Sequence, residues 1–111
     1  MLAVCEFNTR RLSLFRANGE FLRCVGSGVL GVGWNDCCVL RSGLLIVADI
    51  ANHRMVLLDP EAPEDDTCVS EWGSPGLEDG QLQSPVAVAV VGAHCYVLGA
   101  GAAHSRVQMF V

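Results

Sequence analysis

Lysine is absent from the chain, so all seven basic residues are arginine, and twelve Asp and Glu outnumber them. The formal net charge of −5 makes the surface as a whole repel phosphate, which disfavours a general nucleic-acid-binding role. Five of the acids lie in residues 59–66, and the other seven are matched in number by the arginines. The acidity is therefore concentrated in one short segment.

Targeting and membrane segments are also missing from the pattern. Residues 1–11 lack the basic region and the long apolar run of a secretory signal. Residues 80–105 carry no Asp, Glu, Lys or Arg and are long enough for a membrane span of ~20 residues, but proline, glutamines and four glycines interrupt them. Strands explain this stretch better, so we expect a cytoplasmic protein that does not enter a membrane.

The chain has little that points to catalysis. No Ser-His-Asp spacing, phosphate-binding loop or paired general acid and base stands out. The three histidines (His53, His94 and His104) do not form a metal-binding pattern, and residues 59–67 lack the glycine and the glutamate that a calcium loop places at its sixth and twelfth positions. We therefore expect no enzymatic activity and no cofactor, with residues 59–67 as a solvated insertion.

What the sequence does contain is an internal repeat. Residues 3–15 align with residues 46–58 without a gap, at a separation of 43 residues. A third copy begins at Tyr96 and, after two extra turn residues, continues from His104 to Phe110. Each copy has an apolar run, a polar turn that ends in Arg and a second run with alternating apolar positions, which is typical of a β-hairpin.

Glycine-rich segments separate the hairpins, at residues 25–33 and 72–80. Glycine tolerates positive φ, so these segments are predicted loops. The middle copy then has four predicted strands, at Cys38–Leu40, Leu44–Asp49, Arg54–Asp59 and Cys68–Trp72. Four-stranded units of this length form the blades of β-propellers, which need roughly four to eight of them. The chain holds about two and a half, so the predicted all-β fold is an incomplete propeller.

The middle copy resembles a known family. Val47-Ala48-Asp49-Ile50-Ala51-Asn52-His53-Arg54-Met55-Val56-Leu57-Leu58 is similar to the NHL repeat, and residues 72–89 resemble the glycine-rich connection of that repeat into its next blade. Glu6, Thr9 and Arg10 replace the Asp, Asn and His of the motif in the first copy, and Gly99 replaces the Asp in the third. The resemblance implies four-stranded antiparallel NHL-type blades: the last three strands of one in residues 2–33, a complete one in 34–80 and the first three strands of another in 81–111.

The six cysteines form no CxxC pair and no Cys-His spacing suited to zinc. Several of them stand where another copy of the repeat has an apolar residue, as Cys5 stands where Ala48 does. A buried thiol behaves as a small apolar group, so we favour reduced core residues over disulfides or metal ligands. The adjacent Cys37 and Cys38 are predicted to point to opposite faces of a strand.

An arginine recurs at the end of each hairpin turn, at positions 11, 54 and 106. In one interpretation each arginine is structural and hydrogen-bonds backbone carbonyls or an acid such as Asp49. In the other it binds a ligand, because these turns and the connections between blades share one rim of a propeller. The candidate binding residues of this rim are Arg10, Arg11, His53, Arg54, His104, Arg106 and Trp34. The acidic segment follows a third strand and is expected at the opposite end.

The implied function is interaction. The resemblance to NHL proteins implies a scaffold that binds a protein partner and is completed by further blades on the same chain or on another one. The substrate-recognition part of a ubiquitin ligase is one such setting. RNA binding, which the net acidity disfavours, and a metal-dependent lyase-like propeller enzyme are the alternatives.

Overall fold

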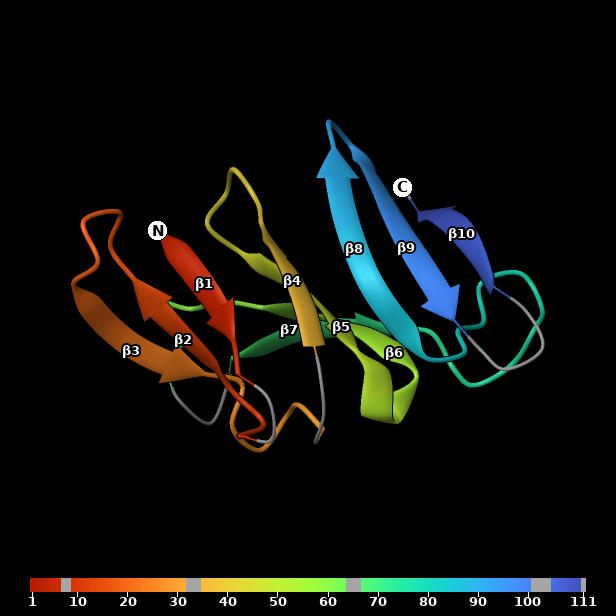
Figure 1. Cartoon of the computed structure of the whole chain (residues 1–111), viewed down its shortest axis with the longest axis horizontal. Helices are drawn as coiled ribbons and strands as arrows, with labels where there is room; N and C mark the ends of the chain where they lie inside the picture. Colours follow the sequence, from red (N-terminus) through yellow and green to blue (C-terminus); the bar gives the residue numbers. More distant parts are fainter. Residues whose placement is uncertain (7–8, 32–34, 64–66, 101–104, 111) are drawn as a thin grey trace.

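The computed structural model describes residues 1–6, 9–31, 35–63, 67–100 and 105–110. Within these residues the protein is all-β, with ten strands in three antiparallel sheets and one short 3-10 turn, η1 (Ile50–Asn52) (Figure 1). No helix in the described ranges is long and apolar enough to cross a membrane. The uncharged stretch that begins at Gly80 instead contains the whole of two strands, β8 (Pro85–Val91) and β9 (His94–Ala100).

The first and third sheets each have three strands. The first sheet has the order β1-β2-β3 and the third has the order β10-β9-β8. In chain order their strands are β1 (Leu2–Cys5), β2 (Leu12–Phe15), β3 (Phe21–Val25), β8 (Pro85–Val91), β9 (His94–Ala100) and β10 (Ser105–Phe110). Every hairpin that the repeat predicts is therefore present as an antiparallel pair.

The middle sheet has four strands in sequence order, β4 (Asn35–Val39), β5 (Leu45–Asp49), β6 (Arg54–Leu58) and β7 (Cys68–Trp72). The first strand, predicted at Cys38–Leu40, overlaps β4 at Cys38 and Val39, but the prediction starts three residues late and ends one residue late. Residues 35–39 pair one by one with residues 49–45, whereas Leu40 belongs to the turn and bonds Leu44 at 2.8 Å. Within the described residues this sheet has the four strands predicted for residues 34–80 and the two flanking sheets have three each, while the propeller arrangement stays a prediction.

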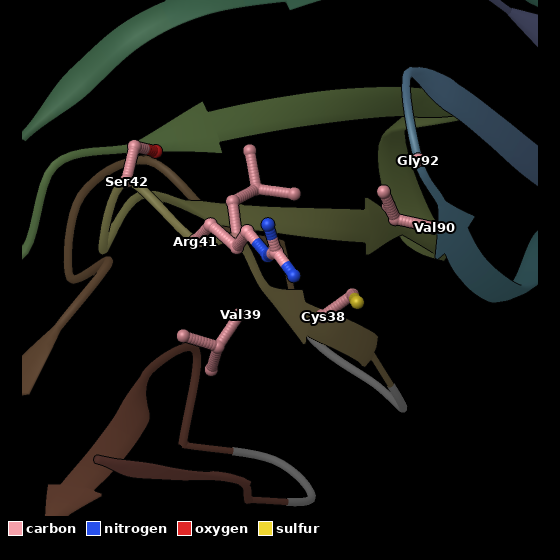
Figure 2. A pocket seen from close by; sticks show the side chains of 7 residues that line it. Cys38, Val39, Arg41, Ser42, Val90 and Gly92 are labelled. Atoms are coloured by element: carbon pink, nitrogen blue, oxygen red, sulfur yellow. The ribbon is translucent and has the colours of Figure 1, made fainter.

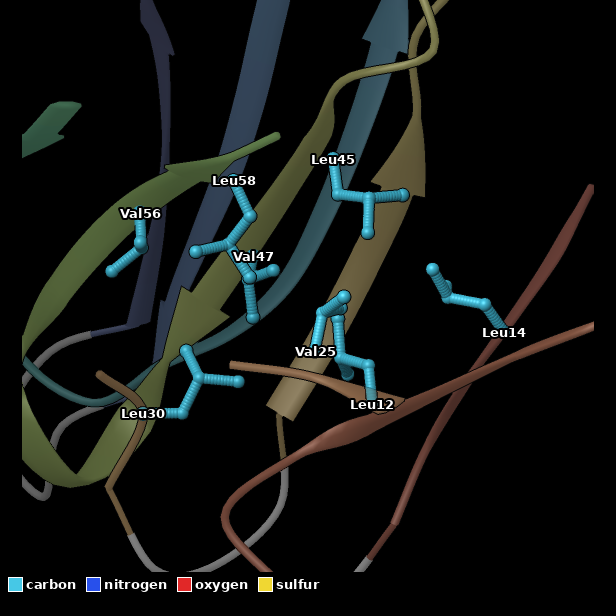
Figure 3. Close-up of a cluster of buried hydrophobic side chains, with 8 residues drawn as sticks. All are labelled: Leu12, Leu14, Val25, Leu30, Leu45, Val47, Val56 and Leu58. Atoms are coloured by element: carbon cyan, nitrogen blue, oxygen red, sulfur yellow. The ribbon is translucent and has the colours of Figure 1, made fainter. Parts of the chain in front are cut away.

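The three sheets stack face to face around two apolar cores. The first core lies between the first and middle sheets (Figure 3) and contains Leu12, Leu14, Val25, Leu30, Leu45, Val47, Val56 and Leu58. The second lies between the middle and third sheets and contains Ile46, Ala48, Met55, Leu82, Val88, Cys95 and Val97. Because β5 has an adjoining sheet on each side, all five of its residues are buried.

The sheets use equivalent residues to pack. We call the face of a sheet that meets the preceding sheet in the sequence its upstream face, and the other its downstream face. In the middle sheet the strand pairing places Leu45, Val47, Val56 and Leu58 on the upstream face. It places Ile46, Ala48, Met55 and Leu57 on the downstream face. The repeat therefore assigns each strand position to one of the two cores.

Both connections between sheets begin with the same backbone feature. Gly26 and Gly73 each have a φ of +93°, in the left-handed region that favours glycine. A Cβ at Gly26 would lie 2.7 Å from Leu30 Cδ1, and one at Gly73 would lie 2.6 Å from Leu82 Cδ1. The glycine thus lets the chain turn back over a leucine, and that leucine anchors each connection in a core.

Candidate interaction surfaces

Arg54 is the most extensively bonded of the three repeated arginines. Its Nε donates to Asp49 Oδ2 at 3.0 Å, one of its Nη atoms pairs with Glu71, and the other donates to the carbonyl of Val29. Asp49 is fully buried and also accepts a hydrogen bond from the amide of Gly31 at 3.1 Å. This cluster, which we call the middle clamp, ties the β5–β6 hairpin to the connection from the first sheet.

Arg106 contacts the preceding connection in a similar way. It donates to the carbonyls of Glu78 at 2.7 Å and Gln81 at 3.1 Å. Gly99 stands in the place of Asp49, and a Cβ there would lie 3.2 Å from the carbonyl oxygen of Gln83. Because Gly99 has no side chain, the connection can lie close to the hairpin at this position. Arg106 therefore bonds the connection without an acidic residue on its own hairpin.

Arg11 is equivalent in sequence and different in environment. It pairs with Glu6 at 3.3 Å, and its side chain is 46% exposed, against 20% for Arg54. Glu6 also accepts hydrogen bonds from Thr9 and Ser13, and these bonds, from Ser13 first and then Thr9 and Arg11, lower the pKa of its carboxyl group. The group Glu6, Thr9, Arg11 and Ser13, the first clamp, is therefore bonded within its own hairpin.

Two further predicted rim residues have an unusual backbone. Arg10 and His53 occupy equivalent positions and both have positive φ, 57° and 51°. His53 Nδ1 accepts a hydrogen bond from the amide of Ser84 at 2.9 Å, which links the middle hairpin to the start of β8. Arg10 is exposed. Trp34 and His104, which were also predicted here, lie outside the described residues.

The described rim is balanced in charge. Its four arginines (Arg10, Arg11, Arg54 and Arg106) are accompanied by four carboxylates, Glu6, Asp49, Glu71 and Asp79. The arginines of the hairpin turns would by themselves make this rim basic, but Arg54 also pairs with Glu71, an acid that comes from β7, the fourth strand. Selective attraction of phosphate is therefore not favoured at this rim.

The acidic segment starts at the other end of β6 from Arg54 because it follows Leu58, the last residue of that strand. Part of it is held against the first sheet, since Arg23 of β3 donates to the carbonyl of Ala62 at 3.0 Å. Within the segment, the Asp59 amide bonds the carbonyl of Thr67 at 2.8 Å. Residues 64–66, which include three of its five acids, lie outside the described residues.

An open hollow of about 610 Å³ lies between the β4–β5 and β8–β9 turns. Figure 2 shows Cys38 and Arg41 on one side of it and Val90 on the other. Its remaining lining is mostly aliphatic or backbone. Arg41 is the single charged residue among the lining residues, and one exposed cation beside apolar side chains gives no specific arrangement of polar groups for a ligand.

None of the six cysteines is joined in a disulfide; Cys95 is buried in the second core, and the other five are partly exposed. Cys37 packs against the first core and Cys38 against the second, so the adjacent pair does point to opposite faces of β4. A hydrogen bond with Cys37, together with burial, raises the pKa of the Cys5 thiol, and the same bond lowers the pKa of Cys37. Among the described residues no group of three or more His, Cys, Asp or Glu is placed to hold a metal ion.

The chain matches no model of a known protein family and no curated protein.

Proposed function

We propose that the chain is a segment of an NHL-type β-propeller that acts as a protein-interaction scaffold. The observation that supports this most is the placement of the repeated turns. Arg11 precedes β2, Arg54 begins β6 and Arg106 is the second residue of β10. In Figure 1 the β5–β6 turn and the facing ends of β1 with β2 and of β9 with β10 lie along one side of the stack. The stacked sheets thus bring the equivalent ends of three hairpins to one side.

The contacts divide the rim residues into two groups with separate tasks. Arg54, Arg106 and His53 bond backbone groups of the connections, so they hold the frame. Arg10 is exposed at the tip of the first hairpin turn, where a partner can reach it. A mixed set of charges on a rigid rim suits a protein partner, whose surface carries both signs, better than it suits a polyanion.

A photo-crosslinking residue placed at Arg10 tests this proposal in cells that make the full-length protein. Arg16, which follows β2 at the far end of that strand and whose side chain is 62% exposed, is the matched control. We expect a discrete adduct from position 10, sensitive to protease and resistant to ribonuclease, and none from position 16. A ribonuclease-sensitive adduct would support RNA binding instead, and equal labelling from both positions would contradict a rim site.

A further inference from the structure

The downstream face of the third sheet is an apolar surface that nothing in the described chain covers. Tyr96, Leu98, Val107 and Met109 share this face, because Tyr96 pairs with Met109 and Leu98 pairs with Val107. Val107 is 63% exposed and Met109 is 54% exposed. Side chains this apolar on neighbouring strands of one sheet face form a contiguous patch, and such patches commonly mark interfaces.

The equivalent positions of the middle sheet show what this face can do. Tyr96, Leu98, Val107 and Met109 correspond to Ile46, Ala48, Met55 and Leu57 in the repeat. Those four residues all pack in the second core, against the upstream face of the following sheet. The third sheet therefore repeats a packing surface that is filled elsewhere in the same molecule.

The opposite end of the stack carries the matching surface. Leu2, Val4, Ser13 and Phe15 form the upstream face of the first sheet, and they correspond to Leu45, Val47, Val56 and Leu58 of the middle sheet. Leu2 is 52% exposed and Val4 is 47% exposed, whereas Leu45 and Val47 are fully buried in the first core. Ser13 is already buried, and it donates a hydrogen bond to Glu6 of the first clamp. Both uncovered faces thus belong to the kind of interface that already joins the sheets.

We propose that a second copy of the chain covers these faces, with the third sheet of one copy stacked on the first sheet of the other. None of the eight positions on the two faces carries a charge, so stacking them leaves no unpaired ion buried. The first clamp does not oppose this, since Glu6 and Arg11 already satisfy one another at the edge of the upstream face.

This inference rests on the proposed propeller fold, in which two copies of the chain form a closed ring. The interface joins two different surfaces, so it must either form a ring or continue as an open fibre. The described residues of each copy supply three sheets. A ring of two copies has six, within the roughly four to eight blades that propellers use, whereas three copies would exceed that range.

Two double variants test whether the two faces meet. The downstream-blocked variant is Val107→Glu with Met109→Glu, and the upstream-blocked variant is Leu2→Glu with Val4→Glu. A matched control is Val69→Glu, at a position on β7 that is 53% exposed and outside both faces. Circular dichroism confirms that each variant is folded, and sedimentation velocity measures its mass.

We expect the sedimenting mass of the wild-type chain and of the control to be twice the 11.8 kDa of one chain. We expect the sedimenting mass of each blocked variant to be that of one chain. Mixing the two blocked variants should restore a dimer through a single interface, because one intact face of each kind remains, while the four introduced glutamates keep the other interface open. This complementation also shows that both variants are folded.

Any one of four results would overturn the proposal. The wild-type chain could be monomeric, a blocked variant could still form dimers alone, the mixture of blocked variants could stay monomeric, or the wild-type chain could form an open polymer. The rim crosslink at Arg10 reports separately, since the substituted side chains lie on the sheet faces. If the chain is monomeric and the crosslink at Arg10 is retained, only the proposed dimer is contradicted. If the dimer forms and the crosslink at Arg10 is lost, only the proposed rim function is contradicted.

Discussion

The middle and third sheets carry the same residue pattern in different surroundings. Met55 of β6 is fully buried, whereas Val107, its equivalent in β10, is 63% exposed. Both are apolar and both sit at the same register position of a hairpin. The comparison shows that the alternation in a strand sets which residues share a face, while a neighbouring sheet decides whether that face is buried.

The largest expected effect comes from truncating one member of this pair. Met55→Ala should lower the free energy of unfolding by about 2–5 kcal/mol, because it leaves a cavity in the second core. The same change at Val107 in the isolated chain should cost less than about 0.5 kcal/mol, since an exposed side chain loses little packing. Urea unfolding below the association concentration measures both, and equal losses would mean that the two sheets are covered alike.

The middle clamp and the first clamp give the next comparison. Arg54→Ala should lower the free energy of unfolding by about 1–3 kcal/mol, because it leaves buried acceptors, including Asp49, without their donor. Arg11→Ala should cost no more than about 1 kcal/mol, as is usual for an exposed ion pair. If Arg54→Ala instead abolished the rim crosslink with an unchanged melting curve, Arg54 would be a binding residue.

The smallest expected effect is a pH dependence in the first clamp. Hydrogen bonds lower the pKa of Glu6 in the folded chain, so its stabilising contribution is full above the pKa of the unfolded state. It is lost as the pH falls through the lower folded-state pKa. Glu6→Gln should therefore reduce the urea midpoint at neutral pH and leave it unchanged at about pH 2, where both chains carry a neutral side chain. A constant difference at both pH values would contradict this origin.

The sequence predicted the hairpins well because each depends on local information. Alternation and the repeat placed β5, β6 and β7 within a residue or so of their observed bounds. The pairing of Arg54 with Asp49 belonged to one of the two interpretations of the repeated arginines, and it is local because the two residues face each other across one hairpin. Short strands next to turns are less determined, and Leu40 was misplaced for that reason.

The remaining features depend on contacts between distant segments. The bonds of Arg54 to Val29 and Glu71 join residues that lie 25 and 17 positions apart, and no hairpin pattern contains them. The alternation of apolar residues likewise could not show that the downstream face of the third sheet and the upstream face of the first sheet lack a covering sheet. Covered and uncovered sheet faces have the same alternation in the sequence. The balanced charge of the rim and the two free faces therefore emerged only from the packing.

The uncovered downstream face of one copy is expected to bind the upstream face of another. Tyr96 is the single tyrosine of the chain and lies on that face, so fluorotyrosine labelling gives one 19F resonance that reports on its surroundings. Added to dilute labelled wild type, the unlabelled downstream-blocked variant should shift this resonance and reduce its sensitivity to solvent isotope, because its upstream face covers Tyr96. The unlabelled upstream-blocked variant should leave the resonance unchanged. Equal responses to both variants, or none to either, would contradict the claim.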